Sequence, residues 1–167
     1  MPTISITSGK LGVNITRTET VAQHVLGDTI FGSHGTKWEY VQAGAALSAK
    51  KWAVIDENGQ LLALTSARAA LGYKVVVPQI DAAEDDYLWV ATMGFFGSAF
   101  AKKTCSADAA LYVTSTAGAV DDTATGHFQL AGALLISAAT ADSGFYGCRF
   151  LSEVYAVKFI DRDAGGL

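Results

Sequence analysis

Asp86-Tyr87-Leu88-Trp89-Val90-Ala91-Thr92-Met93-Gly94 is the most informative stretch of this chain. Side chains alternate between the two faces of a β-strand, so the odd positions place tyrosine, tryptophan, alanine and methionine on one face. The even positions place leucine, valine and threonine on the other face. Because both faces are largely apolar, we expect a strand that is covered by protein on both sides rather than half exposed to water.

Two other segments, Lys37–Ala43 and Ala110–Thr114, have the same mixture of aromatic, aliphatic and β-branched residues. Such residues fit the pleated and half-buried surface of a sheet. We therefore expect the large aromatic residues of these strands to build the core. The candidate core residues are Trp38, Tyr40, Trp52, Tyr87, Trp89 and Tyr112.

The turn signals between the apolar segments favour an all-β fold. Asn58-Gly59 predicts a hairpin with a type I′ turn, in which both central residues have positive φ. Phe95-Phe96-Gly97 predicts another turn, and Phe128–Ile136 with Phe145–Tyr155 predicts a final pair of strands. Helical turns are expected only at Thr65–Gly72. Because turn signals recur at roughly ten-residue spacing, we predict a single-domain β-barrel or β-sandwich with at most one or two short helices.

The amino-terminal segment differs from the rest, because it is rich in threonine and lacks aromatic anchors. Its alternating stretches, Thr3–Thr7 and Val13–Thr16, predict short strands that cannot form a core of their own. We therefore expect an extended arm over residues 1–27, a β-rich body over residues 28–160 and a frayed tail over residues 161–167. The arm residues expected to pack against a partner are Ile4, Ile6, Val13 and Ile15.

Length and charge argue against several classes of function. The chain of 167 residues suits one domain, which would bury roughly 70% of the unfolded surface. Its net charge is −4, from 12 basic and 16 acidic residues without a basic cluster, so we expect no nucleic-acid partner. The apolar runs are too short to cross a bilayer, so we expect no membrane partner. Met1–Ser5 lacks the features of a signal peptide, which predicts synthesis without export.

No group of residues predicts catalysis, a metal or a cofactor. His24, His34 and His127 stand in no metal-ligand spacing. Ser33 directly precedes His34, and adjacent residues cannot face each other as a nucleophile faces its base. The acidic residues of 81–86 could bind a cation, but such a run is more often a solvated turn. We therefore expect that the protein is not an enzyme.

Four further side chains leave alternatives open. Cys105 and Cys148 are too few for a disulfide framework. We interpret Cys148 as a small buried hydrophobe, with a disulfide or a reactive thiol as the alternatives. Phe95 and Phe96 are candidates for an oligomer or capsid interface, and the alternative is that they stack on a sugar.

Three segments resemble elements of the phage head decoration, or capsid cement, proteins. Trp38–Ala46 resembles a segment that reads "kYVqAgaai" in that family. Residues 76–91 are similar to its "vGvpq…gyyGWV" element, although Leu88 stands where a glycine is frequent. Ala107–Asp122 is similar to a later hairpin of the family, and the likeness runs in order over about residues 28–140.

The resemblance implies a β-rich, β-tulip-like protein on the outer capsid surface of a phage virion, made in the host cytoplasm. Its partners would be the major capsid protein, bound between capsomers, and further copies of itself. A homotrimer is favoured, and a homodimer is the alternative. The arm would add a strand to an exposed sheet edge of the capsid. Other readings are a different phage structural β protein, such as a head fibre base or tail component, and a carbohydrate- or receptor-binding module.

Overall fold

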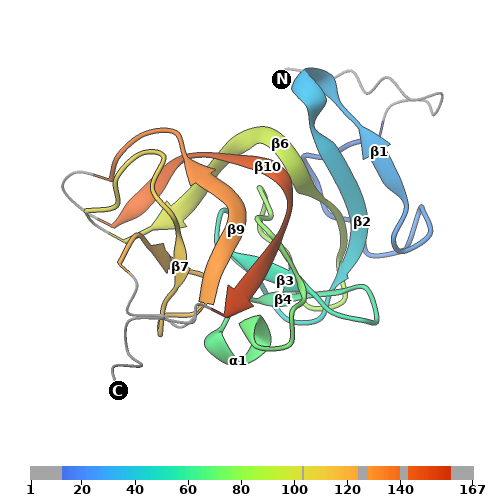
Figure 1. The fold of residues 1–167 in the computed structure, drawn as a ribbon. Coiled ribbons are helices and arrows are strands. Elements are labelled where there is room, and N and C mark those ends of the chain that lie inside the picture. Colours follow the sequence, from blue (N-terminus) through green and yellow to red (C-terminus); the bar gives the residue numbers. More distant parts are fainter. Residues whose placement is uncertain (1–12, 103, 124–127, 140–142, 159–167) are drawn as a thin grey trace.

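The computed structural model describes residues 13–102, 104–123, 128–139 and 143–158, in which ten strands pair into one sheet (Figure 1). The elements are β1 (Thr29–Phe31), η1 (a 3-10 turn, Ser33–Gly35), β2 (Lys37–Ala43), β3 (Ala53–Ile55), β4 (Gln60–Ala63), α1 (Ser66–Ala69), β5 (Lys74–Val76), β6 (Tyr87–Ala101), β7 (Tyr112–Val113), β8 (Val120–Asp121), β9 (Phe128–Leu135) and β10 (Gly144–Lys158). The predicted mainly β domain with at most one or two short helices is confirmed. No helix among these residues is long and apolar enough to span a membrane.

The sheet closes on itself twice, and β6 and β10 take part in both closures. Hydrogen-bonded neighbours lead from β2 through β4, β3, β5, β10 and β6 back to β2, which we call ring one. They also lead from β6 through β8, β7, β9 and β10 back to β6, which we call ring two. In Figure 1, β6 and β10 cross the centre, with β2 on one side and β7 and β9 on the other. The fold is therefore not a clean single barrel but two rings with a shared wall.

The first half of β6 is buried on both faces. Leu88 and Val90 join a cluster with residues of β2, β3, β4 and β5, which fills ring one. Trp89 and Ala91 point the other way, into a larger cluster that continues into ring two. All four side chains are at most 2% exposed. The expectation of a strand covered on both sides is confirmed.

Four of the six predicted core aromatics are buried, namely Trp38, Tyr40, Trp52 and Trp89. The prediction fails in part for Tyr87 and Tyr112, which are only half-buried. Each is the first residue of its strand, and Tyr87 still packs against the larger core cluster, with its ring stacked on that of Tyr40 at 6.0 Å.

The hairpin predicted at Asn58-Gly59 joins β3 to β4, but its turn is of another type. Gly59 has a positive φ of 75°, whereas Asn58 does not. The Asp56 carboxylate accepts hydrogen bonds from the N–H groups of Asn58 at 2.9 Å and Gln60 at 2.8 Å. This carboxylate shapes a longer loop in which only the glycine needs the left-handed region.

Several other predicted elements are confirmed. The helix forms as α1, where the Thr65 hydroxyl caps the first turn by accepting from the Arg68 N–H at 3.3 Å. Gly72 follows it with a φ of +71°, as expected of a residue that ends a helix. The strand pairs β7–β8 and β9–β10 also form as antiparallel ladders.

The turn predicted at Phe95-Phe96-Gly97 is wrong, because β6 continues through it to Ala101. The backbone of β10 pairs along this part, with Arg149 opposite Phe95 and Cys148 opposite Gly97. A register shift between Cys148 and Arg149 marks a bulge there. The glycines therefore bend the strand without ending it.

Residues 13–27 belong to the domain, so the predicted arm over residues 1–27 is corrected in its second part. Ile15 is 6% exposed and lies in the larger core cluster, with Val13 packed partly buried against it. Glu19 pairs with Tyr87 and accepts a hydrogen bond of 2.6 Å from the Tyr40 hydroxyl. The predicted strand at Val13–Thr16 is a turn, because the Asn14 side chain accepts from the Thr16 N–H at 2.9 Å.

Candidate interaction surface

The histidine whose side chain is described contributes to packing. His24 lies edge-on to the rings of Tyr40 and Trp89, with 5.1 Å between ring centroids in both pairs. The side chain of His34 and the whole of His127 lie outside the described residues. His24 thus completes an aromatic cluster and faces no nucleophile.

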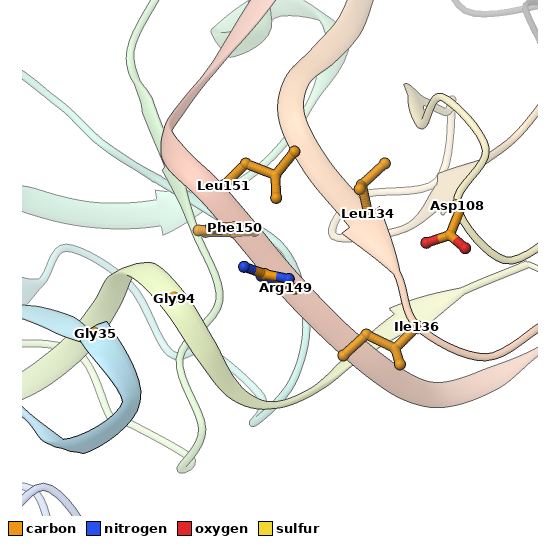
Figure 2. A pocket seen from close by; sticks show the side chains of 8 residues that line it. All are labelled: Gly35, Gly94, Asp108, Leu134, Ile136, Arg149, Phe150 and Leu151. Carbon is orange, nitrogen blue, oxygen red and sulfur yellow. The ribbon is translucent and has the colours of Figure 1, made fainter.

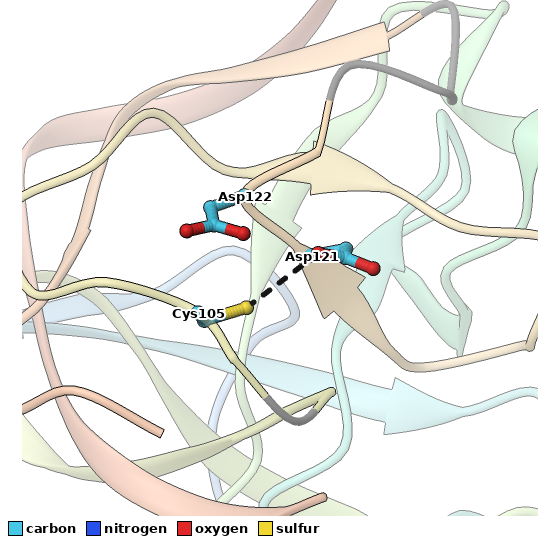
Figure 3. A group of neighbouring side chains, drawn as sticks. All are labelled: Cys105, Asp121 and Asp122. Atoms are coloured by element: carbon cyan, nitrogen blue, oxygen red, sulfur yellow. Dashed lines mark hydrogen bonds between the residues drawn. The ribbon is translucent and has the colours of Figure 1, made fainter. Parts of the chain in front are cut away.

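Cys105, Asp121 and Asp122 form a close group whose ligand-type atoms lie within 4.8 Å of one another (Figure 3). The Cys105 thiol donates to Asp121 Oδ1 at 3.9 Å, and Asp122 Oδ2 accepts from the Ser106 N–H at 2.8 Å. Burial, with smaller effects from the two carboxylates, raises the pKa of Cys105 to about 11. The thiol is therefore a protonated donor at neutral pH, and the group ties the end of β8 to the loop at Cys105-Ser106.

Cys148 is fully buried on β10, and burial raises its pKa to about 12. Both cysteines are free, so the alternative of a disulfide between them is excluded. A thiol that is inaccessible and protonated is a poor nucleophile. The interpretation of Cys148 as a small buried hydrophobe is confirmed.

A network of charged side chains closes one end of ring one. Lys74 of β5 donates to Glu39 of β2 at 2.6 Å, although these strands are not neighbours in the sheet. Lys37 donates to Glu153 at 2.7 Å, and Lys74 lies 3.6 Å from the same carboxylate. The hydrogen bond from Lys37 lowers the pKa of Glu153, and the charges of both lysines add to this effect. These charged groups therefore cover the apolar interior of ring one, and we call Lys37, Glu39, Lys74 and Glu153 the polar lid.

Lys74 is the central cation of this lid. Its burial lowers its pKa, but the hydrogen bond to Glu39 and the attraction of Glu39 and Glu153 together outweigh burial and raise it. A buried charge without such partners would be costly. The lid thus consists of groups that satisfy one another, which leaves them unavailable as catalytic acids or bases.

The acidic run 81–86 is a turn, as expected. Its carboxylates bind backbone and side-chain N–H groups: Asp81 accepts from the Ala49 N–H at 2.7 Å, and Asp86 accepts from the Ala83 N–H at 3.0 Å. Asp85 has a φ of +68° and accepts from the Gln42 amide at 3.2 Å. These bonds account for the three aspartates as turn-forming residues.

The outer face of β10 carries several exposed apolar side chains. Inward and outward side chains alternate along the strand, and the even positions from Cys148 to Ala156 include most of its buried residues. Its exposed outward residues are Phe145, Arg149, Leu151, Tyr155 and Val157, and the partly exposed Glu153 lies between Leu151 and Tyr155. Exposed apolar side chains that are grouped together can mark a protein interaction site.

A hollow of about 530 Å³ lies on this face, between β6, β9 and β10 (Figure 2). Leu134 and Ile136 line it from the β9 side, and Leu151 lines it from β10. Arg149 and Asp108 are its two charged residues. In Figure 2 Asp108 lies at one end of the lining residues and Arg149 lies nearer their middle, with Leu134 and Ile136 between the two charges.

The floor of the hollow depends on two glycines. Gly94 has a φ of +89°, and a Cβ added there would lie 2.8 Å from the Gly35 carbonyl oxygen and from Thr36 Cα. Only glycine allows η1 to lie this close to β6. The contact fixes the position of η1 beside the wall that both rings share.

The residues that the sequence suggested for partner contacts do not share one location in the structure. Ile4 and Ile6 lie outside the described residues, and so do the side chains of Phe95 and Phe96. Ile15 is in the core, so it is not available to bind a partner. Sequence reasoning missed the face of β10, although alternation in Phe145–Val157 is the signal that could have revealed it.

No protein-family model, no curated protein and no solved structure matches this chain.

Proposed function

We propose that this chain is a structural decoration protein, which binds the outer surface of a phage head between capsomers and stabilises the shell. The observation that carries the proposal is the apolar outer face of β10 with its hollow, a surface suited to contact rather than chemistry. The clustered polar side chains of the described residues, by contrast, bind one another or the backbone.

The resemblance to capsid cement proteins supplies the partner, the major capsid protein. Its three segments fall on the strands of the two rings, β2, β5 to β6 and β7 to β8. A clamp across capsomer joints needs contact area, and several modest contacts made together give high avidity. The protein would act as a homo-oligomer on the virion, with a trimer favoured by the resemblance and a dimer as the alternative.

The proposed attachment segment is the part of the arm that precedes the domain. Residues 1–12 contain the alternating Ile4 and Ile6 and no acidic residue. Such a segment suits the addition of a strand to a sheet edge of the capsid, with both isoleucines packed on one face. Deletion of residues 1–24 would also remove Ile15, Glu19 and His24 from the core, so the informative deletion ends at residue 12.

The test is co-sedimentation of purified protein with DNA-filled heads that lack it. We expect wild-type protein to saturate the heads and the variant without residues 1–12 to bind at least about tenfold more weakly. Ile4→Glu with Ile6→Glu should reproduce the loss. The matched control, Ser5→Glu with Thr7→Glu, places the same charges on the opposite face of the same stretch. Absence of wild-type binding would refute decoration, and equal effects of both pairs would refute packing through the isoleucines.

A further inference from the structure

The two charged residues of the hollow have no counter-ion among the described residues. Among the described residues, neither Arg149 nor Asp108 takes part in an ion pair or a side-chain hydrogen bond. Both side chains are exposed. The hollow therefore presents a positive group and a negative group, both unsatisfied by the fold itself.

The surroundings of these charges are apolar. Leu151 is 56% exposed and Ile136 is 46% exposed, and both line the hollow. Farther along β10, Phe145 is 51% exposed. Exposed aliphatic and aromatic side chains around an arginine have the composition of the centre of a protein interface.

At Cys148, Arg149 and Phe150 the backbone of β10 pairs with β6 on one side and with β9 on the other. A partner at Arg149 must therefore pack against the face of the sheet through side chains. The regular pairing of β9 with β10 is interrupted between Phe150 and Tyr155, and Leu151 lies in this interruption.

We infer that a second copy of this chain covers the hollow, related to the first by a two-fold axis that passes through it. In a two-fold interface, if residue i of one copy contacts residue j of the other, then j also contacts i. Arg149 of each copy would then pair with Asp108 of the partner subunit, so one hollow brings together two ion pairs. Leu151 and Ile136 of both copies would pack between them.

A second copy satisfies these observations better than an unrelated surface. An unrelated partner would need a carboxylate and a cation placed in the correct order across an apolar patch. A copy of the chain carries both, because the two charges line the same hollow and apolar side chains separate them. The inference assigns to self-association the apolar face of β10 on which the proposed function also draws, and it leaves the capsid contact to residues 1–12.

Sedimentation equilibrium of the full chain, in buffer of low ionic strength, tests the inference. We expect wild-type protein to sediment at twice the chain mass of 17.5 kDa. Arg149→Asp and Asp108→Arg, each alone, place like charges together and should weaken dimerisation by about tenfold to a hundredfold. The double variant exchanges the two charges and should restore it. Arg17→Asp, at an exposed arginine outside the hollow, is the control and should leave the mass unchanged.

A cross-linking experiment gives a second readout. Cys105 and Cys148 are buried, so a cysteine introduced at Leu151 would be the reactive thiol of the folded protein. We expect a short bifunctional maleimide to convert Leu151→Cys into a covalent dimer. Val25→Cys, at a side chain that is 73% exposed and does not line the hollow, should not cross-link.

Three results would overturn the inference. These are a wild-type monomer at all concentrations, a trimer, and failure of the double variant to recover the association that each single variant loses. A trimer would leave the decoration proposal intact, because the proposal requires an oligomer but not this axis. Failure to bind capsids, conversely, would not affect the dimer.

Discussion

β6 and β10 are the two strands that take part in both rings, but the first half of β6 and β10 are buried differently. Between Tyr87 and Met93, β6 separates two apolar clusters, and its side chains pack on both faces. β10 is buried on the face of Phe150 and Val154 and presents the face of Leu151 and Val157 to solvent. Both segments are rich in apolar residues, so hydrophobicity alone does not distinguish them.

The difference shows that an apolar strand face can either pack in the core or remain exposed on the surface. On β6 both faces serve the fold, because an apolar cluster packs against each of them. On β10 one face serves the fold and the other is exposed, and this is the face that we infer a second copy covers. Substitutions on β6 should therefore affect stability, whereas those on the outer face of β10 should affect association.

Trp89→Ala is the substitution with the largest expected effect, and it tests whether β6 contributes more to stability than the outer face of β10. The indole is 2% exposed, with its ring 5.0 Å from that of Tyr40 and 5.1 Å from that of His24. The cavity left behind should lower the free energy of unfolding by about 3–5 kcal/mol, measured by urea denaturation. Tyr155→Ala on the outer face of β10 is the control, with an expected loss of less than about 1 kcal/mol. Equal losses would contradict the division between the two strands.

Gly94→Ala tests the bend of β6 at the point where it meets η1. The new Cβ would meet the Gly35 carbonyl oxygen and Thr36 Cα at 2.8 Å, in a backbone with positive φ. We expect a loss of about 2–4 kcal/mol in thermal or urea unfolding. Gly72→Ala has a similar φ of +71° but nothing within 4 Å, so it isolates backbone strain at about 1–2 kcal/mol. If both variants lose the same free energy of unfolding, the close approach of η1 to β6 does not contribute to stability.

A matched pair on β10 sharpens the comparison within one strand. Val154 is fully buried and Val157 is half exposed, so valine-to-threonine exchange places the same hydroxyl inside and outside. Val154→Thr should cost about 1–3 kcal/mol of stability, because the hydroxyl is desolvated. Val157→Thr should change stability by less than about 0.5 kcal/mol. A large effect of Val157→Thr on the monomer would show that its face is part of the fold.

The smallest expected effect concerns the polar lid of ring one. The pKa of Glu153 is lowered from 4.5, so its ionised form stabilises the fold at neutral pH. That stability is present above pH 4.5 and is lost as the pH falls through the lower pKa of the folded state. Glu153→Gln should remove about 0.5–1 kcal/mol at pH 7. The gap in melting temperature between the variant and wild type should close as the pH falls through the lowered pKa of Glu153, and a gap that stays constant with pH would assign the effect to packing.

Local sequence patterns predicted the strands well and their turns less well. The apolar residues on both faces of Tyr87–Met93 correctly indicated burial on both sides. At Asn58-Gly59 the hairpin followed from the dipeptide, but its geometry depended on the carboxylate of Asp56 just outside the motif. The Phe95-Phe96-Gly97 segment contains a turn-forming residue, yet pairing with β10 keeps it in the strand.

The candidate surface was harder to predict, because it depends on contacts distant in sequence. Arg149 and Asp108 share a hollow only because β9 and the loop before β7 meet the shared wall. No spacing within the sequence brings them together. Ile15 was assigned to the arm because its neighbours lack aromatic residues, but the rings of Tyr40 and Trp89 in other strands complete the core on which its segment packs.

The position of β10 in the chain has a consequence for biosynthesis. It is the last described strand, and both rings require it for closure. A nascent chain that ends before residue 144 therefore lacks the ladders to β5, β6 and β9, and most of these contacts link residues far apart in sequence. Such non-local pairing is slow to form, so apolar strands stay exposed and can aggregate during translation. Prematurely terminated chains would consequently remain unfolded and be removed by proteases, so that only chains that contain the whole of β10 reach the folded state.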